Sequence, residues 1–366
     1  MAAEKLKIVD FLEHSRAVPV LDVRSPGEFS HASIPGAFSL PLFSDEERKV
    51  VGTLYKQKSR EAAIKAGLDF FGPKMRRMVE EAEAICRDFK PGQNQVNRRE
   101  KTILVHCWRG GMRSGAVAWL LDLYGFKVYT LVGGYKYFRR WVLETLSNPG
   151  PIRVLGGYTG SGKTDLLQML ASRYNEPVVD LEGLAGHKGS AFGAIGLPKQ
   201  GSQEMFENNL ALSIFATRTW KTNEQEEAYI WMEDESQRIG TVNLPQPFWL
   251  HFRKQPVYFL DIPFEERLQY LVSTYGKLNK GDLASAITRI QKRLGGLETK
   301  TALLHLVEGN ITESFRILLT YYDKKYEKSL QERDDHEKLI HLVPSARVEA
   351  EENVRQIHSI KTPIQL

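Results

Sequence analysis

The stretch TILVHCWRGGMRSGAVAWLLDLYG, residues 102–125, decides the fold of the first part of the chain. Its beginning, Thr102 to His106, is a short apolar run typical of a buried strand. Its end, Ser114 to Gly125, carries apolar residues at helical spacing and stops at a glycine, as helices often do. The sequence therefore predicts a strand, a tight loop and a helix, with Cys107 at the start of the loop.

The loop that follows Cys107 is suited to negative charge. The successive backbone N–H groups of this loop would lie at the N-terminus of the following helix, where the helix dipole favours an anion. Gly110 and Gly111 let the backbone curl, while Arg109 and Arg113 offer donors to a bound oxyanion. We expect Cys107 to be a thiolate at neutral pH and not a buried structural cysteine. Phosphatases and sulfur-transfer loops both use a cysteine followed by an arginine at this spacing, so the spacing leaves the reaction open.

Composition limits the class of protein. A chain of 366 residues that is 42% hydrophobic and 26% charged is long enough for two globular domains. With Cys86 and Cys107 as its only cysteines, it has neither a disulfide framework nor a thiolate zinc site. Cys86 is expected on the apolar face of a helix. The charged N-terminus and the lack of an apolar run of about 18 residues predict a soluble cytoplasmic protein without a membrane span.

Several motifs in the first half resemble a rhodanese domain over about residues 16–146. They are Asp22-Val23-Arg24, Glu28-Phe29, His31, Ile34 to Ala37, the Cys107 loop and LVGGYKYFRRW from Leu131. A strand ending at Asp22, a turn at Ser25 to Gly27 and a short strand after Gly36 are expected. We predict that Asp22 and Arg24 form an internal ion pair that braces the fold.

An insertion at about residues 44–97 separates the two rhodanese halves. We predict one helix that begins at its acidic residues and ends at Gly67, a second helix after Pro73, and a polar loop at 91–100. Residues 1–148 hold 24 Lys and Arg against 17 Asp and Glu, whereas the remainder holds 26 against 28. Residues 48–77 hold nine basic and two acidic side chains, so this insertion accounts for the excess.

A turn-rich segment at Ser147 to Pro151 predicts the boundary between domains 1–148 and 149–366. The strand IRVLG then leads into GYTGSGKT, Gly157 to Thr164, which has the pattern of a phosphate-binding loop before a helix. Its glycines let N–H groups converge on a diphosphate, its lysine adds charge, and its threonine can hold a magnesium-bound oxygen. The candidate phosphate-binding residues are Gly157, Gly160, Gly162, Lys163 and Thr164.

Further polar residues follow two predicted strands of the second domain. The strand at Val178 precedes Asp180, Glu182, His187 and Lys188, which we expect to face the phosphate-binding loop. The strand from Ala228 runs into Glu233, Asp234 and Glu235, where such domains keep a carboxylate near a metal; exposed acids at a strand end are the alternative. A further buried strand at 256–261 and a helix after Pro263 predict a parallel α/β sheet, followed by a mostly helical C-terminal third.

The whole chain resembles the tRNA 2-selenouridine synthase family. The motifs that carry this resemblance are CWRGGMRS, VGGYK, GGYTGSGKT, DLEGLAGHKGSAFG, EDESQRIG and YYDKKY. The resemblance implies a rhodanese-like parallel-sheet domain followed by a P-loop NTPase-like α/β domain with a helical C-terminal region.

The resemblance also implies an activity. Members of this family geranylate wobble 2-thiouridine in tRNA with geranyl diphosphate, then exchange geranylthiol for selenium from selenophosphate. The resemblance places selenophosphate at the Cys107 loop and the diphosphate of the geranyl donor at the P-loop. It implies no tightly bound cofactor, and it allows a Mg²⁺ ion at the P-loop. A transient contact with a selenophosphate-producing enzyme is a further possible partner. Whether Cys107 forms a perselenide is left open.

If tRNA is the substrate, the basic insertion is a candidate anticodon-arm surface, since tRNA is held largely through its phosphates. The candidates there are Lys56, Lys58, Arg60, Arg76 and Arg77, with Tyr55, Phe70 and Phe71 among them. A second set lies in the C-terminal third: Arg289, Lys292 and Arg293, and a helix with Tyr321, Tyr322 and Tyr326. Solvated helix faces are the alternative for both sets.

Two other enzyme classes fit the motifs. A rhodanese-like phosphatase fused to a kinase-like domain would release phosphate from small esters, and an ATP-dependent sulfurtransferase would turn over ATP through Lys163. A non-catalytic tRNA-binding scaffold is disfavoured because it would give the cysteine loop no role.

Overall fold

The computed structural model describes residues 3–90, 101–190, 192–220 and 229–360. The chain forms two compact units, residues 1–144 and 145–366. The polar loop predicted at 91–100 lies outside the described residues. Within the described ranges, no helix is long and apolar enough to cross a bilayer.

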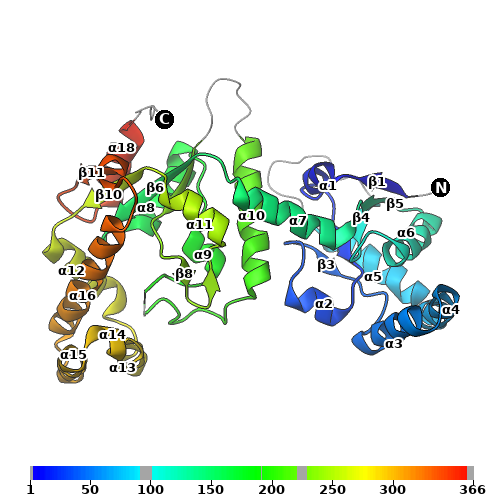
Figure 1. The fold of residues 1–366 in the computed structure, drawn as a ribbon, viewed down its shortest axis with the longest axis horizontal. Coiled ribbons are helices and arrows are strands. Elements are labelled where there is room, and N and C mark those ends of the chain that lie inside the picture. The colour runs from blue at the N-terminus through cyan, green and yellow to red at the C-terminus, as the bar shows by residue number, and fades with distance from the viewer. Residues whose placement is uncertain (1–2, 91–100, 191, 221–228, 361–366) are drawn as a thin grey trace. The chain divides into compact units, whose positions relative to one another are not determined.

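The first unit is built on a five-stranded sheet in the order β1-β5-β4-β2-β3, and every neighbouring pair is parallel (Figure 1). The predicted strands at Asp22, after Gly36 and at 102–106 are confirmed. All residues of β4 are buried, and its carboxyl end leads directly into Cys107. The strands are β1 Glu4–Leu6, β2 Val20–Asp22, β3 Phe38–Ser39, β4 Thr102–His106 and β5 Lys127–Leu131.

Two helix boundaries in this unit differ from the sequence prediction. The predicted turn at Ser25 to Gly27 starts a short helix, because Ser25 and Glu28 form a capping box around its first turn. The single helix expected up to Gly67 is two helices, since Ser59 caps a new start and accepts from the N–H of Ala62. The helices are α1 Ile8–His14, α2 Pro26–His31, α3 Asp45–Gln57, α4 Arg60–Phe71, η1 Gly72–Lys74, α5 Met75–Asp88, α6 Met112–Tyr124 and α7 Gly134–Ser147.

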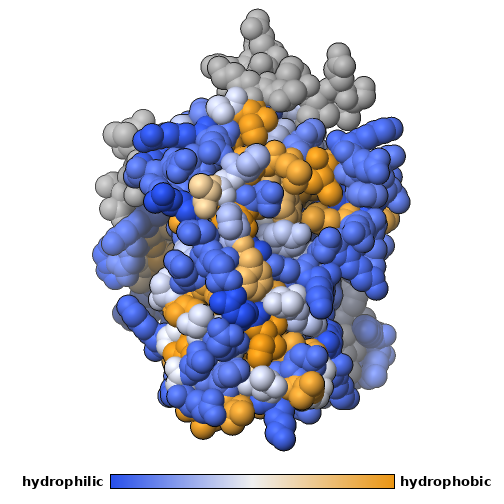
Figure 2. All heavy atoms as spheres, turned by 90° about the vertical axis from the view of Figure 1, so that its left-hand side faces the viewer, coloured by the Kyte–Doolittle hydropathy of each residue, from blue (hydrophilic) through white to orange (hydrophobic). Residues whose placement is uncertain are grey.

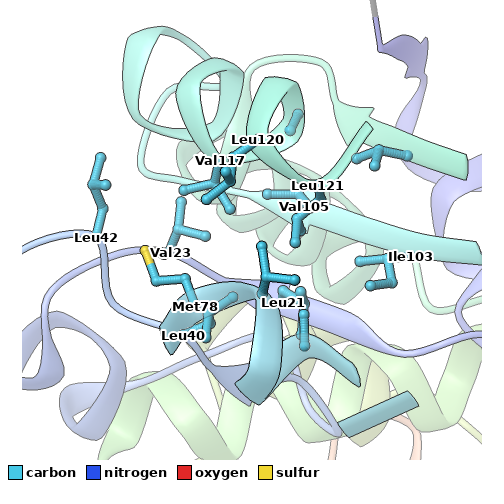
Figure 3. Close-up of a cluster of buried hydrophobic side chains, with 14 of the residues drawn as sticks. Leu21, Val23, Leu40, Leu42, Met78, Ile103, Val105, Val117, Leu120 and Leu121 are labelled. Carbon is cyan, nitrogen blue, oxygen red and sulfur yellow. The ribbon is translucent and has the colours of Figure 1, made fainter. Parts of the chain in front are cut away.

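The last helix of the insertion belongs to the core of the first unit (Figure 3). Met78 of α5 packs with Leu21 and Val105 of the sheet and with Val117 and Leu121 of α6, and all five are almost fully buried. Cys86 lies at the edge of the same cluster, as the sequence predicts for a packed side chain. The insertion is therefore a structural part of the domain and not an appendage.

The second unit is built on a four-stranded parallel sheet in the order β11-β10-β6-β7. The strand expected at Val178 is reduced to one bridge to Trp231, because Asp180 caps a helix immediately after it. β11 falls in the third expected to be mostly helical; only Val343 of its five residues is buried, so it lacks the alternation of a half-buried strand. The strands are β6 Ile152–Gly157, β7 Ile230–Glu233, β10 Val257–Asp261 and β11 Ile340–Pro344, with a small antiparallel pair β8 Arg238–Ile239 and β9 Val242–Asn243.

Helices cover this second sheet and extend beyond it. α8 follows the phosphate-binding loop and packs against α18, so the C-terminal helix helps to fix the loop's own helix. A separate helical subcluster of α12 to α16 encloses its own apolar core. The face that includes α15 and α16 in Figure 1 is mainly hydrophilic, with hydrophobic side chains in small groups among charged ones (Figure 2).

The helices of the second unit have the following bounds. They are α8 Lys163–Tyr174, α9 Leu181–Ala185, α10 Gln203–Trp220, α11 Gln246–Arg253, α12 Phe264–Tyr275, α13 Lys280–Arg289, α14 Gln291–Leu294, α15 Gly296–Glu308, α16 Ile311–Gln331, α17 His336–Leu339 and α18 Ala350–Ser359.

Candidate functional site

The Cys107 thiol lies at the base of its loop. Cys107 is only 3% exposed and borders the hydrophobic core, while Trp108 and Arg109 stand on the exposed part of the loop. The Sγ atom lies 3.2 Å from the Ser114 hydroxyl on the first turn of α6. The expectation of an exposed thiol is corrected: the residue is buried as structural cysteines are, but within a shell of polar donors.

These donors set the charge of the thiol. Burial acts to raise the pKa of Cys107, but bonds from the Ser114 hydroxyl and from the N–H groups of Ser114, Arg109 and Gly111 outweigh it, so the pKa lies below its usual value. This is the direction expected for a cysteine before a helix N-terminus. The arrangement favours a thiolate.

A second loop, Val132 to Lys136, holds the Cys107 loop in shape. The N–H groups of Tyr135 and Lys136 donate to the carbonyls of Cys107 at 2.8 Å and Trp108 at 2.9 Å. Gly110 and Gly134 both have positive φ, and a Cβ atom on Gly134 would lie 2.3 Å from the Cys107 oxygen. The two loops therefore approach so closely that a side chain at Gly134 is excluded.

The two arginines of the loop have different environments. Arg113 donates from Nη1 to Glu28 Oε2 at 2.8 Å, and Arg48 lies 3.6 Å from the same carboxylate. Burial acts to raise the pKa of Glu28, yet its bonds to Arg113 and Ser25 and the nearby Arg48 lower it. Arg109 is exposed and makes no ion pair with the described residues. Of the two arginines in the loop, Arg109 is therefore the one whose N–H donors remain available to a bound anion.

The Asp22–Arg24 pair is internal, as predicted. Both side chains are at most 1% exposed, and Arg24 Nε and Nη2 donate to the Asp22 carboxylate at 2.6–3.0 Å. The Arg24 guanidinium also lies 3.7 Å from the centre of the Tyr135 ring. The pair joins β2 to the loop that supports Cys107.

The second candidate site surrounds the phosphate-binding loop between β6 and α8. Gly157, Gly160 and Gly162 all have positive φ, the conformation that turns successive N–H groups inward. The Lys163 ammonium donates to the Gly157 carbonyl at 2.7 Å, across the loop. The Thr164 hydroxyl lies 3.4 Å from Glu182. The loop residues are in the arrangement expected for holding phosphate groups.

Three carboxyl groups crowd beside this loop. The Glu233 carboxylate accepts from the Glu182 N–H at 2.7 Å, and its second oxygen has no partner among the described residues. Burial, followed by the charges of Glu182 and Glu235, raises the pKa of Glu233 well above its usual value. Burial and the Glu182 charge also raise the pKa of Glu235 to about 8. Glu182 and Glu235 are close enough to share a proton.

A pocket of about 460 Å³ opens beside the loop and has a mixed lining. Its polar lining includes Gly160 to Thr164 of the loop with Glu182, Glu233 and Glu235. Its apolar lining includes Phe192, Leu271, Phe315, Leu318 and Leu319. Such a pocket suits a ligand with a phosphate head and a hydrocarbon body.

The structure separates the other predicted residues of this site. Asp180 caps α9 by accepting from the Gly183 N–H, and His187 is buried outside the pocket lining, whereas Lys188 lines the pocket. Asp234 is engaged by the Tyr326 hydroxyl at 2.7 Å and by the Arg333 guanidinium.

Sequence reasoning missed three residues that shape the loop. The Tyr326 hydroxyl accepts from the Gly157 N–H at 3.2 Å, so this tyrosine is not on a solvated face. Arg267 donates to the Thr159 carbonyl at 3.1 Å and is held by Asp323, while Arg333 pairs with Asp234. The motif YYDKKY contained a local signal, because Tyr322 and Tyr326 are four residues apart and share one helix face, and both line the pocket beside the loop.

The candidate tRNA-binding residues are only partly available. Arg76 and Arg77 form ion pairs with Glu80 and Glu81 one turn along α5. Lys56, Lys58 and Arg60 are exposed without an ion pair in the described part of the chain; Lys58 directly follows α3 and Arg60 begins α4. The prediction that Phe70 and Phe71 belong to this surface is wrong, because both pack in the core with Phe43. Arg289 and Arg293 are exposed at the ends of α13 and α14.

The two units define a class of protein: a rhodanese-like domain with a cysteine loop, followed by a P-loop α/β domain. Residues 7–140 match the rhodanese-like domain family, and residues 150–341 match the family described as the tRNA 2-selenouridine synthase AAA domain. Two proteins named tRNA 2-selenouridine synthase span most of the chain. The one from Hydrogenovibrio crunogenus is 35% identical and covers 86% of this chain and 90% of its own. The one from Bdellovibrio bacteriovorus is 32% identical and covers 93% of this chain and 95% of its own.

A third relative with this name, from Nitrosomonas europaea, is 37% identical over 70% of this chain and 63% of its own. The chain belongs to the tRNA 2-selenouridine synthase family.

Proposed function

We propose that this chain converts 2-thiouridine at the wobble position of tRNA to 2-selenouridine through an S-geranyl intermediate. The proposal rests on one observation above all: a member of this family has both a buried thiol among hydrogen-bond donors and a pocket lined by the phosphate-binding loop and by apolar side chains. The P-loop pocket would take geranyl diphosphate, and the Cys107 loop would take selenophosphate.

In the first step the thiocarbonyl sulfur attacks C1 of the geranyl group. The C–O bond to diphosphate breaks, diphosphate leaves, and the N3 proton of the base is released. Lys163 and the loop N–H groups stabilise the charge that develops on the departing diphosphate. Phe315, Leu318 and Leu319 hold the hydrocarbon and exclude water, which would otherwise compete for the reactive carbon.

In the second step selenium of selenophosphate attacks C2 of the base and displaces geranylthiol. Water then cleaves the P–Se bond and releases phosphate. Alkylation prepares this exchange because it converts a poor sulfur leaving group into a good one. Selenophosphate is a small tetrahedral anion, and the N–H groups that face Cys107, together with Arg109, match its charge.

Mg²⁺ fits the P-loop pocket only with the diphosphate present. No group of three or more His, Cys, Asp or Glu side chains in the described residues is arranged to hold a metal. Thr164 and Glu182 offer oxygens beside the loop, and Mg²⁺ commonly takes one or two protein oxygens plus phosphate oxygens. When bound there, the ion would neutralise charge on the diphosphate.

The test is reconstitution with the purified full chain. Transcribed tRNA carrying wobble 2-thiouridine is incubated with geranyl diphosphate and selenophosphate, and the nucleosides are measured by mass spectrometry. We expect S-geranyl-2-thiouridine with geranyl diphosphate alone and 2-selenouridine with both donors. An ATP requirement for turnover would favour a sulfurtransferase instead, and release of phosphate from phosphotyrosine would favour a phosphatase.

A further inference from the structure

The exposed rim of the Cys107 loop carries two aromatic side chains. Trp108, the residue after the cysteine, is 37% exposed, and Tyr137 at the start of α7 is 40% exposed. The backbone contacts described above bring their two segments together, because the Lys136 N–H donates to the Trp108 carbonyl and Tyr137 follows directly. Both segments of the Cys107 loop's rim therefore carry an exposed aromatic side chain.

The Trp108 ring is supported on its inner side. Its centre lies 5.8 Å from the ring of Tyr135, which is fully buried and stacked in turn on His106. The fold therefore holds the indole in position without covering it. A large exposed aromatic ring with a fixed orientation is a platform for another flat ring, since little side-chain entropy is lost on stacking.

Cations without an ion pair in the described residues flank these two aromatic residues in the chain. Arg109 follows Trp108 in the loop, and Lys136 and Arg140 are one turn apart on α7. All three are exposed, and none forms an ion pair within the described residues. By contrast, Arg76 and Arg77 of the insertion are neutralised by neighbouring glutamates.

We infer that Trp108, Tyr137, Arg109, Lys136 and Arg140 form the surface that receives a single-stranded RNA loop, with one base stacked on Trp108. Aromatic rings among cations are the pattern that binds unpaired bases and their phosphates. A folded duplex would offer phosphates without an open base, so the exposed indole favours a loop over a helical stem. This inference rests on the proposed tRNA substrate and names the surface that presents the anticodon loop to Cys107.

The experiment measures binding of the full chain to an anticodon stem-loop RNA that carries 2-thiouridine at the wobble position. Trp108→Ala should weaken binding roughly 5- to 100-fold, the range for loss of stacking on one base. Trp108→Phe should retain most of the affinity. Trp119→Ala is the matched control, because this tryptophan of α6 is 54% exposed and should leave the affinity unchanged.

Salt dependence separates stacking from charge. Trp108→Ala should lower the affinity without changing the slope of log affinity against log salt. Lys136→Gln with Arg140→Gln should reduce that slope by roughly 1.4, at about 0.7 for each single-strand phosphate contact. Tyr137→Ala provides a second aromatic variant if Trp108→Ala unfolds.

Equal affinities of Trp108→Ala and Trp119→Ala, with unchanged melting temperatures, would overturn the inference while leaving the proposed function intact. A base-paired RNA of equal length that competes as well as the loop would also overturn it. If the wild-type chain neither binds nor modifies the RNA, both the inference and the proposed function are wrong.

Discussion

The Cys107 loop and the phosphate-binding loop at Gly157 to Thr164 connect a strand to a helix in the same way, but the chemical groups around them differ. Each joins a buried parallel strand to a helix through a turn that uses positive φ, at Gly110 in the first loop and at Gly157, Gly160 and Gly162 in the second. The first surrounds a thiol whose pKa is lowered, and its nearest carboxylate, Glu28, is paired with Arg113. The second has no thiol and faces carboxyl groups whose pKa is raised.

This difference suggests how the two proposed steps, geranyl transfer and selenium transfer, could take place at separate sites of one chain. Hydrogen-bond donors gathered around Cys107 suit a small anion. Donors beside apolar side chains and carboxyl groups of raised pKa suit a diphosphate with a hydrocarbon attached. The predictions that follow test whether the two loops act separately.

Lys163→Ala should have the largest effect on the second loop. Loss of this ammonium from the departing diphosphate should slow geranylation about 10²–10³-fold, at a cost of a few kcal/mol. The measurement is the single-turnover rate of S-geranyl-2-thiouridine formation. The alkylation rate of Cys107 by iodoacetamide serves as the control and should stay the same. Unchanged geranylation would remove the P-loop from the reaction.

Gly134→Ala should destabilise the first unit, which contains the Cys107 loop, without affecting the phosphate-binding loop. The added Cβ would meet the Cys107 carbonyl at 2.3 Å on a backbone with φ of +59°, which should destabilise the first unit by at least about 2 kcal/mol. Gly115→Ala in α6 is the matched control, since its Cβ would meet no atom within 4 Å. Denaturant unfolding measures both variants. A stable Gly134→Ala protein would show that the loops are not tightly interlocked.

The carboxyl groups of the second site should make stability depend on pH. The pKa of Glu235 is raised to about 8 from a usual 4.5, so the folded chain holds a proton in this range that the unfolded chain releases. Stability should therefore fall as the pH rises from about 4.5 to 8. Glu235→Gln should reduce this fall by about 1–3 kcal/mol, less than the full shift implies because Glu182 shares the proton.

Thermal unfolding at pH 5 and pH 8 measures this effect, with the exposed Glu337→Gln as control. Equal pH dependence in wild type and Glu235→Gln would show that Glu235 does not hold the proton.

Ser114→Ala should have the smallest effect. Removal of the hydroxyl 3.2 Å from the Cys107 sulfur should raise the pKa of Cys107, because the thiolate loses one of the hydrogen bonds that stabilise it. The pH profile of iodoacetamide alkylation reports this pKa, and Cys86 in the same sample provides the reference. An unshifted profile would assign the lowered pKa to the backbone N–H groups alone.

The sequence predicts the local parts of both loops well, because each strand, glycine turn and helix is encoded in contiguous residues. It predicts the Asp22–Arg24 brace for the same reason, since the two residues are neighbours. It fails where a single cap decides, as at Ser59, or where a strand is as exposed as β11. The contacts of Tyr326 and Arg267 with the P-loop join residues more than 100 positions apart, and the local sequence does not name the partner of either residue.

Two errors have a common physical cause. Phe71 and Cys107 both have charged residues nearby in the sequence, and for this reason both were expected to be exposed. Both side chains are buried. Charged neighbours on a helix or loop point away from a residue that faces the core, so composition alone does not report burial.

The most direct test of separate sites is the nucleoside content of tRNA after reaction with the Cys107→Ala protein. Full chain, 2-thiouridine tRNA, geranyl diphosphate and selenophosphate are combined, and the wobble nucleoside is identified by mass spectrometry. We predict that S-geranyl-2-thiouridine accumulates at the wild-type rate and that 2-selenouridine is absent. Loss of both products in a correctly folded Cys107→Ala protein, or continued formation of 2-selenouridine, would contradict this division of the two steps.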